Sequence, residues 1–185
     1  MFERIGFTFI LLVMFLAACD NNAAVHNRID DAPKIGTTPR GMLVKAEAGV
    51  TAGPEQMAAI DEGTARVFGK AQCIGYAIGL NAGRYQAVLL KADGVRDGVP
   101  YIAIPVGKYK GTEFDHNGKQ FMAGEFIEPN TLVFVVAGAL PALDGVAEHE
   151  MTHAMYFLNN KAKYNETKIH TAGQEFDLPP CKAPP

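Results

Sequence analysis

The chain has 185 residues, of which 48% are hydrophobic and 20% are charged. This length suits one ordinary domain with processing segments, and the apolar content excludes a wholly disordered chain because it can supply a packed core. The formal net charge of −3 argues against nucleic-acid binding, since proteins that bind nucleic acids normally carry a basic surface.

The first residues have the organisation of a bacterial secretory signal. Arg4 precedes an apolar run over residues 5–15, which is too short for a comfortable membrane span, and the run ends at Leu16-Ala17-Ala18-Cys19. This ending resembles a bacterial lipobox. The resemblance implies a signal peptide over residues 1–18, removed by cleavage, and a lipid on Cys19 that anchors the chain at a bilayer surface. The alternative is an ordinary secretory signal that happens to contain a cysteine.

We therefore expect a lipid-anchored protein of the bacterial cell envelope, on the periplasmic side of a membrane. Asp20 favours the inner membrane, because an aspartate after the lipidated cysteine favours retention there in enteric-like lipoproteins. The two other cysteines, Cys73 and Cys181, could form a disulfide in this oxidising compartment. The alternative for Cys73 is a buried thiol in an apolar stretch.

Residues 19–45 are expected to form the lipid anchor and a flexible tether. They are polar and rich in turn-forming residues, and we find no apolar period in them. His26 lies in this segment and is expected to be solvated. The folded domain is therefore predicted over residues 46–185.

The predicted domain has an α+β pattern. Apolar residues at helical spacing, with Pro54 at a suitable first position, predict a helix over residues 51–68. A second helix is predicted over residues 142–159, where seven apolar residues form a broad face. Between the helices, alternation and glycine-containing turns predict an antiparallel or mixed sheet of about four strands, at residues 85–91, 101–106, 121–127 and 131–137. His116 stands beside Asn117-Gly118 and is assigned to a loop tip.

The second predicted helix contains the run His149-Glu150-Met151-Thr152-His153. Helical residues four apart share a face, so His149 and His153 can direct two imidazoles at one tetrahedral Zn²⁺ ion. Glu150 is then placed as the general base that takes a proton from a zinc-activated water. The alternative, two surface histidines on an amphipathic helix, fits poorly because the inner positions are uncharged.

This run and its flanks match the HExxH motif of zincin metalloproteases. A zinc site requires a further ligand, and Asn159 stands where a metzincin would have its third histidine. A gluzincin would instead supply a glutamate on a following helix. Glu175 and Glu166 are the candidates for that ligand.

Residues 146–176 resemble the SprT-like (Spartan-type) metalloproteases more closely. In that family a third histidine precedes a short Gly-x-Glu-Phe segment, which Gly173, Glu175 and Phe176 match here. The resemblance implies His170 as the third ligand, although Thr171-Ala172 is inserted between this histidine and the glycine. His170, Glu175 and Glu166 therefore all stay open as the third ligand.

The sequence predicts a small zincin-like domain that hydrolyses peptide bonds of an envelope protein or peptide. In zincins an edge strand above the active-site helix pairs with extended substrate, and residues 131–137 are a candidate for that strand. Both faces of this strand are apolar, so a buried central strand is the alternative. The alternative function is that of a non-enzymatic lipoprotein whose zinc site serves stability or partner binding.

Overall fold

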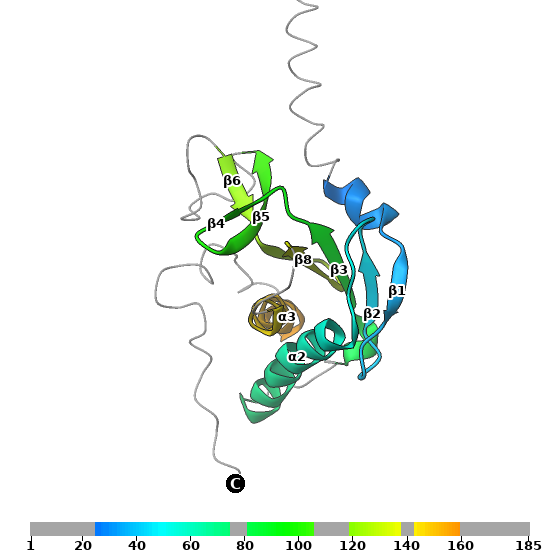
Figure 1. Cartoon of the computed structure of the whole chain (residues 1–185). Coiled ribbons are helices and arrows are strands. Elements are labelled where there is room, and N and C mark those ends of the chain that lie inside the picture. Colours follow the sequence, from blue (N-terminus) through cyan, green and yellow to red (C-terminus); the bar gives the residue numbers. More distant parts are fainter. Residues whose placement is uncertain (1–24, 75–80, 106–118, 138–142, 160–185) are drawn as a thin grey trace, which may run out of the picture.

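The computed structural model describes residues 25–74, 81–105, 119–137 and 143–159 (Figure 1). It shows an α+β fold, as predicted. The long helices are α2 (Pro54–Ile74) and α3 (Leu143–Asn159). The bounds of α3 agree with the prediction to within one residue, whereas α2 continues six residues past its predicted end at residue 68. Residues 25–31 are also helical, and a short 3₁₀ turn, η1 (Ala82–Arg84), precedes the first central strand.

The main sheet has five strands in the order β1-β2-β3-β8-β7. The pairs β2–β3 and β3–β8 are parallel, whereas the outer strands β1 and β7 run antiparallel to their neighbours. The bounds are Lys34–Thr37 for β1, Leu43–Ala46 for β2, Gln86–Lys91 for β3, Gly124–Ile127 for β7 and Thr131–Val136 for β8.

A second sheet has three antiparallel strands in the order β4-β5-β6. They span Gly94–Arg96, Val99–Pro105 and Lys119–Met122. The strand predicted over residues 121–127 is therefore two strands in two sheets, β6 and β7, which separate at Ala123. The chain passes from the second sheet to the main sheet at this residue. The Ala123 carbonyl already accepts a hydrogen bond from the Val135 amide of β8, at 2.9 Å.

The central strands carry two cores on opposite faces, because successive side chains of a strand alternate in direction. Leu89 and Phe134 belong to the core that α2 and α3 cover. Val88 and Val133 belong to the core formed with residues 25–32 and strands β5 and β6. Burial on both faces explains the continuous apolar sequence of β8. Figure 1 shows that α2 and α3 lie together on one side of the sheet.

The predicted tether is wrong from residue 25 onward. Residues 25–31 form a helix whose Val25 and Ile29 are buried, and residues 34–46 contribute β1 and β2. Arg28 secures this segment, since its guanidinium donates to both carboxylate oxygens of Glu47 at 2.9 and 2.7 Å. Among the described residues, no helix is both long and apolar enough to cross a membrane.

The helices α2 and α3 pack at very short range because α2 has a glycine at the crossing. A Cβ atom at Gly63 would lie 2.1 Å from the Asp144 carbonyl oxygen and 2.9 Å from the Ala147 Cβ. No side chain fits in this space. The glycine thus brings α3 against α2, and the other side of α3 faces the sheet.

Candidate metal centre

Helix α3 brings the two predicted ligands together. His149 and His153 lie one turn apart, their ring centroids are 4.8 Å apart, and their Nε2 atoms are 3.1 Å apart. His153 is buried at 3% exposure, whereas His149 is partly exposed. The pair therefore has one imidazole fixed in the core and one at the border of solvent.

The donor geometry fits a divalent metal ion. Two imidazole nitrogens bound to one tetrahedral zinc, each at about 2.0–2.1 Å, lie about 3.3 Å apart. The observed separation of 3.1 Å is close to this value, and neutral imidazole nitrogen is a preferred zinc donor. His149 and His153 are thus the residues of α3 that would hold the metal.

The third ligand is not identified within the described residues. They contain no group of three or more histidine, cysteine, aspartate or glutamate side chains that could hold a metal. His170, Glu175 and Glu166 all lie outside the described residues, as do the matching residues Gly173 and Phe176. The choice among the three ligands stays a prediction.

Glu150 lies on the side of α3 that faces the sheet. It is buried at 5% exposure, and its carboxylate lies against Gly124, the first residue of β7. A Cβ atom built on Gly124 would be only 2.5 Å from Glu150 Oε1 and 3.0 Å from Val146 Cγ1. The carboxylate therefore occupies space that any other residue at position 124 would take for its own side chain.

Strand β7 is an edge of the main sheet. One side pairs with β8 in the register Gly124↔Phe134 to Ile127↔Thr131, and no described strand pairs with the other side. An unpaired strand edge can add an extended peptide by main-chain hydrogen bonds. The prediction that residues 131–137 form this edge is wrong, because β8 lies between β3 and β7 and all its residues are buried; the alternative of a central strand is confirmed.

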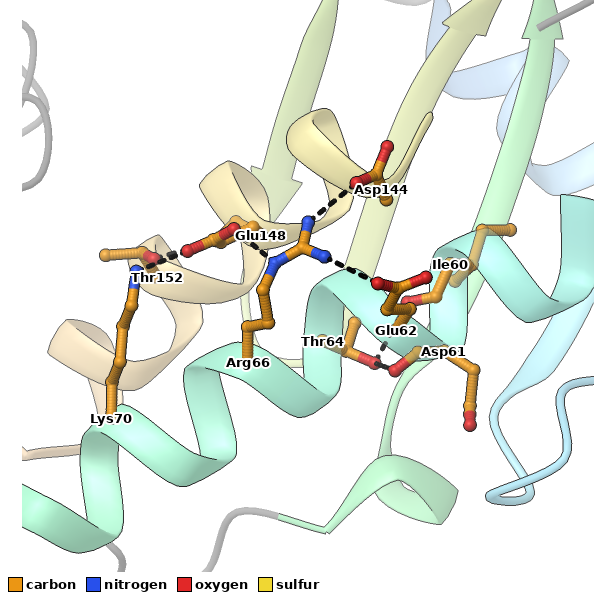
Figure 2. A network of polar contacts seen from close by, with 9 residues as sticks. All are labelled: Ile60, Asp61, Glu62, Thr64, Arg66, Lys70, Asp144, Glu148 and Thr152. Carbon is orange, nitrogen blue, oxygen red and sulfur yellow. Dashed lines mark hydrogen bonds and ion pairs between the residues drawn. The ribbon is translucent and has the colours of Figure 1, made fainter. Parts of the chain in front are cut away.

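The opposite side of α3 is held by a cluster of ion pairs with α2 (Figure 2). Arg66 of α2 donates from Nε to Glu148 at 2.6 Å and from Nη2 to Asp144 at 2.8 Å. Its Nη1 also contacts Glu62 at 3.2 Å, and Lys70 donates to the other Glu148 oxygen. We call Arg66, Lys70, Asp144 and Glu148 the α2–α3 ion cluster.

The charges in this cluster lower the pKa values of both α3 carboxyls. Burial opposes ionisation of Glu148, but hydrogen bonds from Lys70 and Arg66 outweigh it and lower its pKa. The hydrogen bond from Arg66 lowers the pKa of Asp144. In the other direction, Glu148 and then Asp144 raise the pKa of the Arg66 guanidinium. Both carboxylates and the Arg66 guanidinium are therefore charged near neutral pH.

The remaining predicted residues have mixed outcomes. Cys73 is disulfide-bonded, and because Cys19 and Cys181 both lie outside the described residues, the pairing with Cys181 stays a prediction. His26 is exposed, as expected for a solvated side chain. His116 also lies outside the described residues.

Sequence reasoning did not single out Gly124 or the α2–α3 ion cluster. Gly124 was visible only as a glycine inside an apolar strand, which often marks a close approach of another group. Arg66 and Glu148 are 82 positions apart, so no local pattern connects them. Comparison of the chain with family models, with curated proteins and with solved structures gave no match.

Proposed function

We propose that this protein is a zinc-dependent peptidase of the bacterial cell envelope, held to the membrane by a lipid on Cys19. The observation that carries the proposal is the convergence of the His149 and His153 Nε2 atoms at 3.1 Å on a helix whose Glu150 is buried against an edge strand. A metal-binding pair, a carboxylate base and a peptide-binding edge are the components of peptide hydrolysis by a metal-activated water.

The element order supports a zincin-like fold for the domain. Helix α3 lies between α2 on one side and the mixed sheet on the other. The antiparallel edge strand β7 lies beside Glu150. A purely structural zinc site does not need a buried glutamate beside the outermost described strand of the sheet. This placement of Glu150 favours the enzyme over the structural alternative.

Each residue then has a chemical task. His149 and His153 would hold the zinc, with His170 as the proposed third ligand, and zinc would supply Lewis acidity toward the peptide carbonyl and a bound water. Glu150 accepts the proton of the attacking water at a carboxylate oxygen and returns it to the leaving amine. The outer edge of β7, with which no described strand pairs, would orient the substrate backbone beside this carboxylate.

Metal analysis and hydrolysis of a quenched peptide library test the proposal on the purified lipoprotein. The wild type is expected to bind about one zinc per chain, as structural and catalytic sites of this kind do. His153→Ala should lose the metal, while His26→Ala, which alters an exposed histidine, should keep it. Glu150→Gln should keep the metal and lose hydrolysis. A metal-free wild type, or full activity in Glu150→Gln, contradicts the proposal.

The third ligand and the lipid anchor have separate tests. His170→Ala is expected to weaken zinc binding far more than Glu175→Gln or Glu166→Gln, since loss of a zinc ligand leaves the shell incomplete. A larger effect of either glutamine variant would identify that glutamate as the third ligand instead. Cys19→Ser should abolish incorporation of labelled palmitate and release the protein from membranes. Incorporation that survives this substitution contradicts lipidation at Cys19.

A further inference from the structure

Gly124 is unusual because its backbone does not require glycine. The described glycines with positive φ are Gly41, Gly49 and Gly98, at +89°, +84° and +81°. Gly124 is not among them and lies in regular antiparallel pairing with Phe134. Glycine weakens a strand, since it has no side chain to pack and high conformational freedom when unfolded. The reason for glycine at position 124 must therefore lie in what surrounds it.

The surroundings point to Glu150. Alternation along β7 places Gly124 and Phe126 on the face toward α3, where Phe126 is buried and its ring lies 5.7 Å from that of Phe157. At position 124 the corresponding space is filled by the Glu150 carboxylate, with Oε1 2.5 Å from the site of a Cβ atom. A side chain from β7 and the carboxylate from α3 cannot both be there.

We propose that Gly124 is a positioning residue for the general base: by having no side chain, it lets the Glu150 carboxylate rest against the backbone of the edge strand. This inference deepens the proposed peptidase function and rests on it. The consequence is geometric, because a peptide added to the outer edge of β7 would have its backbone held beside the same strand as the base. Gly124 thereby sets the distance between base and substrate without touching the substrate.

Gly124→Ala should separate catalysis from folding. The crowding atoms are mainly the end of a flexible side chain, so the carboxylate should move away while the strand stays in place. A displacement of about 1 Å in a catalytic group can cost about 100-fold in rate. We expect kcat to fall by about 10- to 100-fold, while KM, zinc content and the unfolding midpoint stay close to wild type.

Two further variants exclude a merely structural effect. Glu150→Asp withdraws the carboxylate by one methylene. In the double variant Gly124→Ala/Glu150→Asp the added methyl group therefore no longer meets the carboxylate, and its remaining close neighbour is Val146 Cγ1 at 3.0 Å. The effects on kcat should therefore be strongly non-additive, with the double variant no worse than Glu150→Asp alone. The matched control is Gly145→Ala on α3, where a Cβ meets no atom within 4 Å and activity should be unchanged.

The outcomes distinguish this inference from the function on which it rests. A wild type that binds no zinc or cleaves no peptide overturns both. An active wild type with an unchanged kcat in Gly124→Ala, or with strictly additive losses in the double variant, overturns the role of Gly124 alone. Loss of kcat in Gly124→Ala together with a matching loss of zinc or of the folded state also overturns it, because position 124 would then act through the fold.

Discussion

The two sides of α3 carry glutamates only two positions apart, and their surroundings differ completely. Glu148 faces α2, where Arg66 and Lys70 both donate to its carboxylate (Figure 2). Glu150 faces the sheet at 5% exposure and lies against the strand backbone at Gly124. One side of the helix, which we call its attachment side, therefore binds α2, and the other side carries the proposed general base. The sequence predicts the task of Glu150 from the histidine spacing, but it does not reveal that Glu148 binds Arg66 and Lys70 of α2.

The sharpest test of this comparison exchanges each glutamate for glutamine. Glu150→Gln should lower kcat by about 10²- to 10⁴-fold, the usual contribution of a general base, with little change in stability. Glu148→Gln should leave kcat within about threefold and cost about 1 kcal/mol of unfolding free energy, because it weakens a partly exposed ion pair. Peptide hydrolysis and thermal unfolding of both variants measure the two effects. The comparison fails if Glu148→Gln loses as much turnover as Glu150→Gln.

A substitution at Gly63, where α2 comes closest to α3, tests the attachment side of α3 in a second way. Gly63→Ala places a methyl group 2.1 Å from the Asp144 carbonyl oxygen, so α2 and α3 must separate, at a cost of about 1–3 kcal/mol as in other overpacked cores. The control is Gly69→Ala in the same helix, where an added Cβ meets nothing within 4 Å. That control should gain up to about 1 kcal/mol from helix propensity. Equal unfolding midpoints for the two variants would show that the helices do not depend on this contact.

The smallest expected effect is a pH dependence confined to the attachment side. The pKa of Glu148 is lower in the folded protein than its ordinary value of 4.5. Its ion pairs therefore stabilise the fold above pH 4.5, and this contribution disappears as the pH falls through the lowered pKa and the carboxylate is protonated. The difference in unfolding midpoint between wild type and Glu148→Gln should accordingly shrink as the pH falls from about 6 to about 3. A difference that stays constant over this range contradicts the assignment.

The local parts of the fold and site could be predicted from sequence. Both long helices and the strands β3, β5 and β8 follow from apolar spacing, and the histidine pair follows from helical geometry. The segment before residue 46 was misjudged, although Val25, Ile29 and Ala32 recur at helical spacing and are all buried. Frequent turn residues concealed that period, and the partners that bury these side chains lie more than 50 positions away.

The edge strand was misassigned for a related reason. Apolar alternation identifies a strand but does not reveal its neighbours, and β7 is shorter and less apolar than β8. Its place at the edge depends on the separation of β6 and β7 into different sheets at Ala123. Long-range packing of this kind has no signature in a single sequence, so the relation between Gly124 and Glu150 became visible only in three dimensions.

The burial of Val25 in the helical residues 25–31 would also limit the reach of a domain anchored by a lipid on Cys19. Only six peptide links connect Cys19 with Val25, and they span at most about 20 Å when fully extended. Val25 is already buried in the folded domain. With a lipid on Cys19, the folded domain would therefore stay within about 20 Å of its own bilayer surface and would not reach across the envelope. Substrates would have to come to that layer, as membrane-tethered proteins and newly exported chains do.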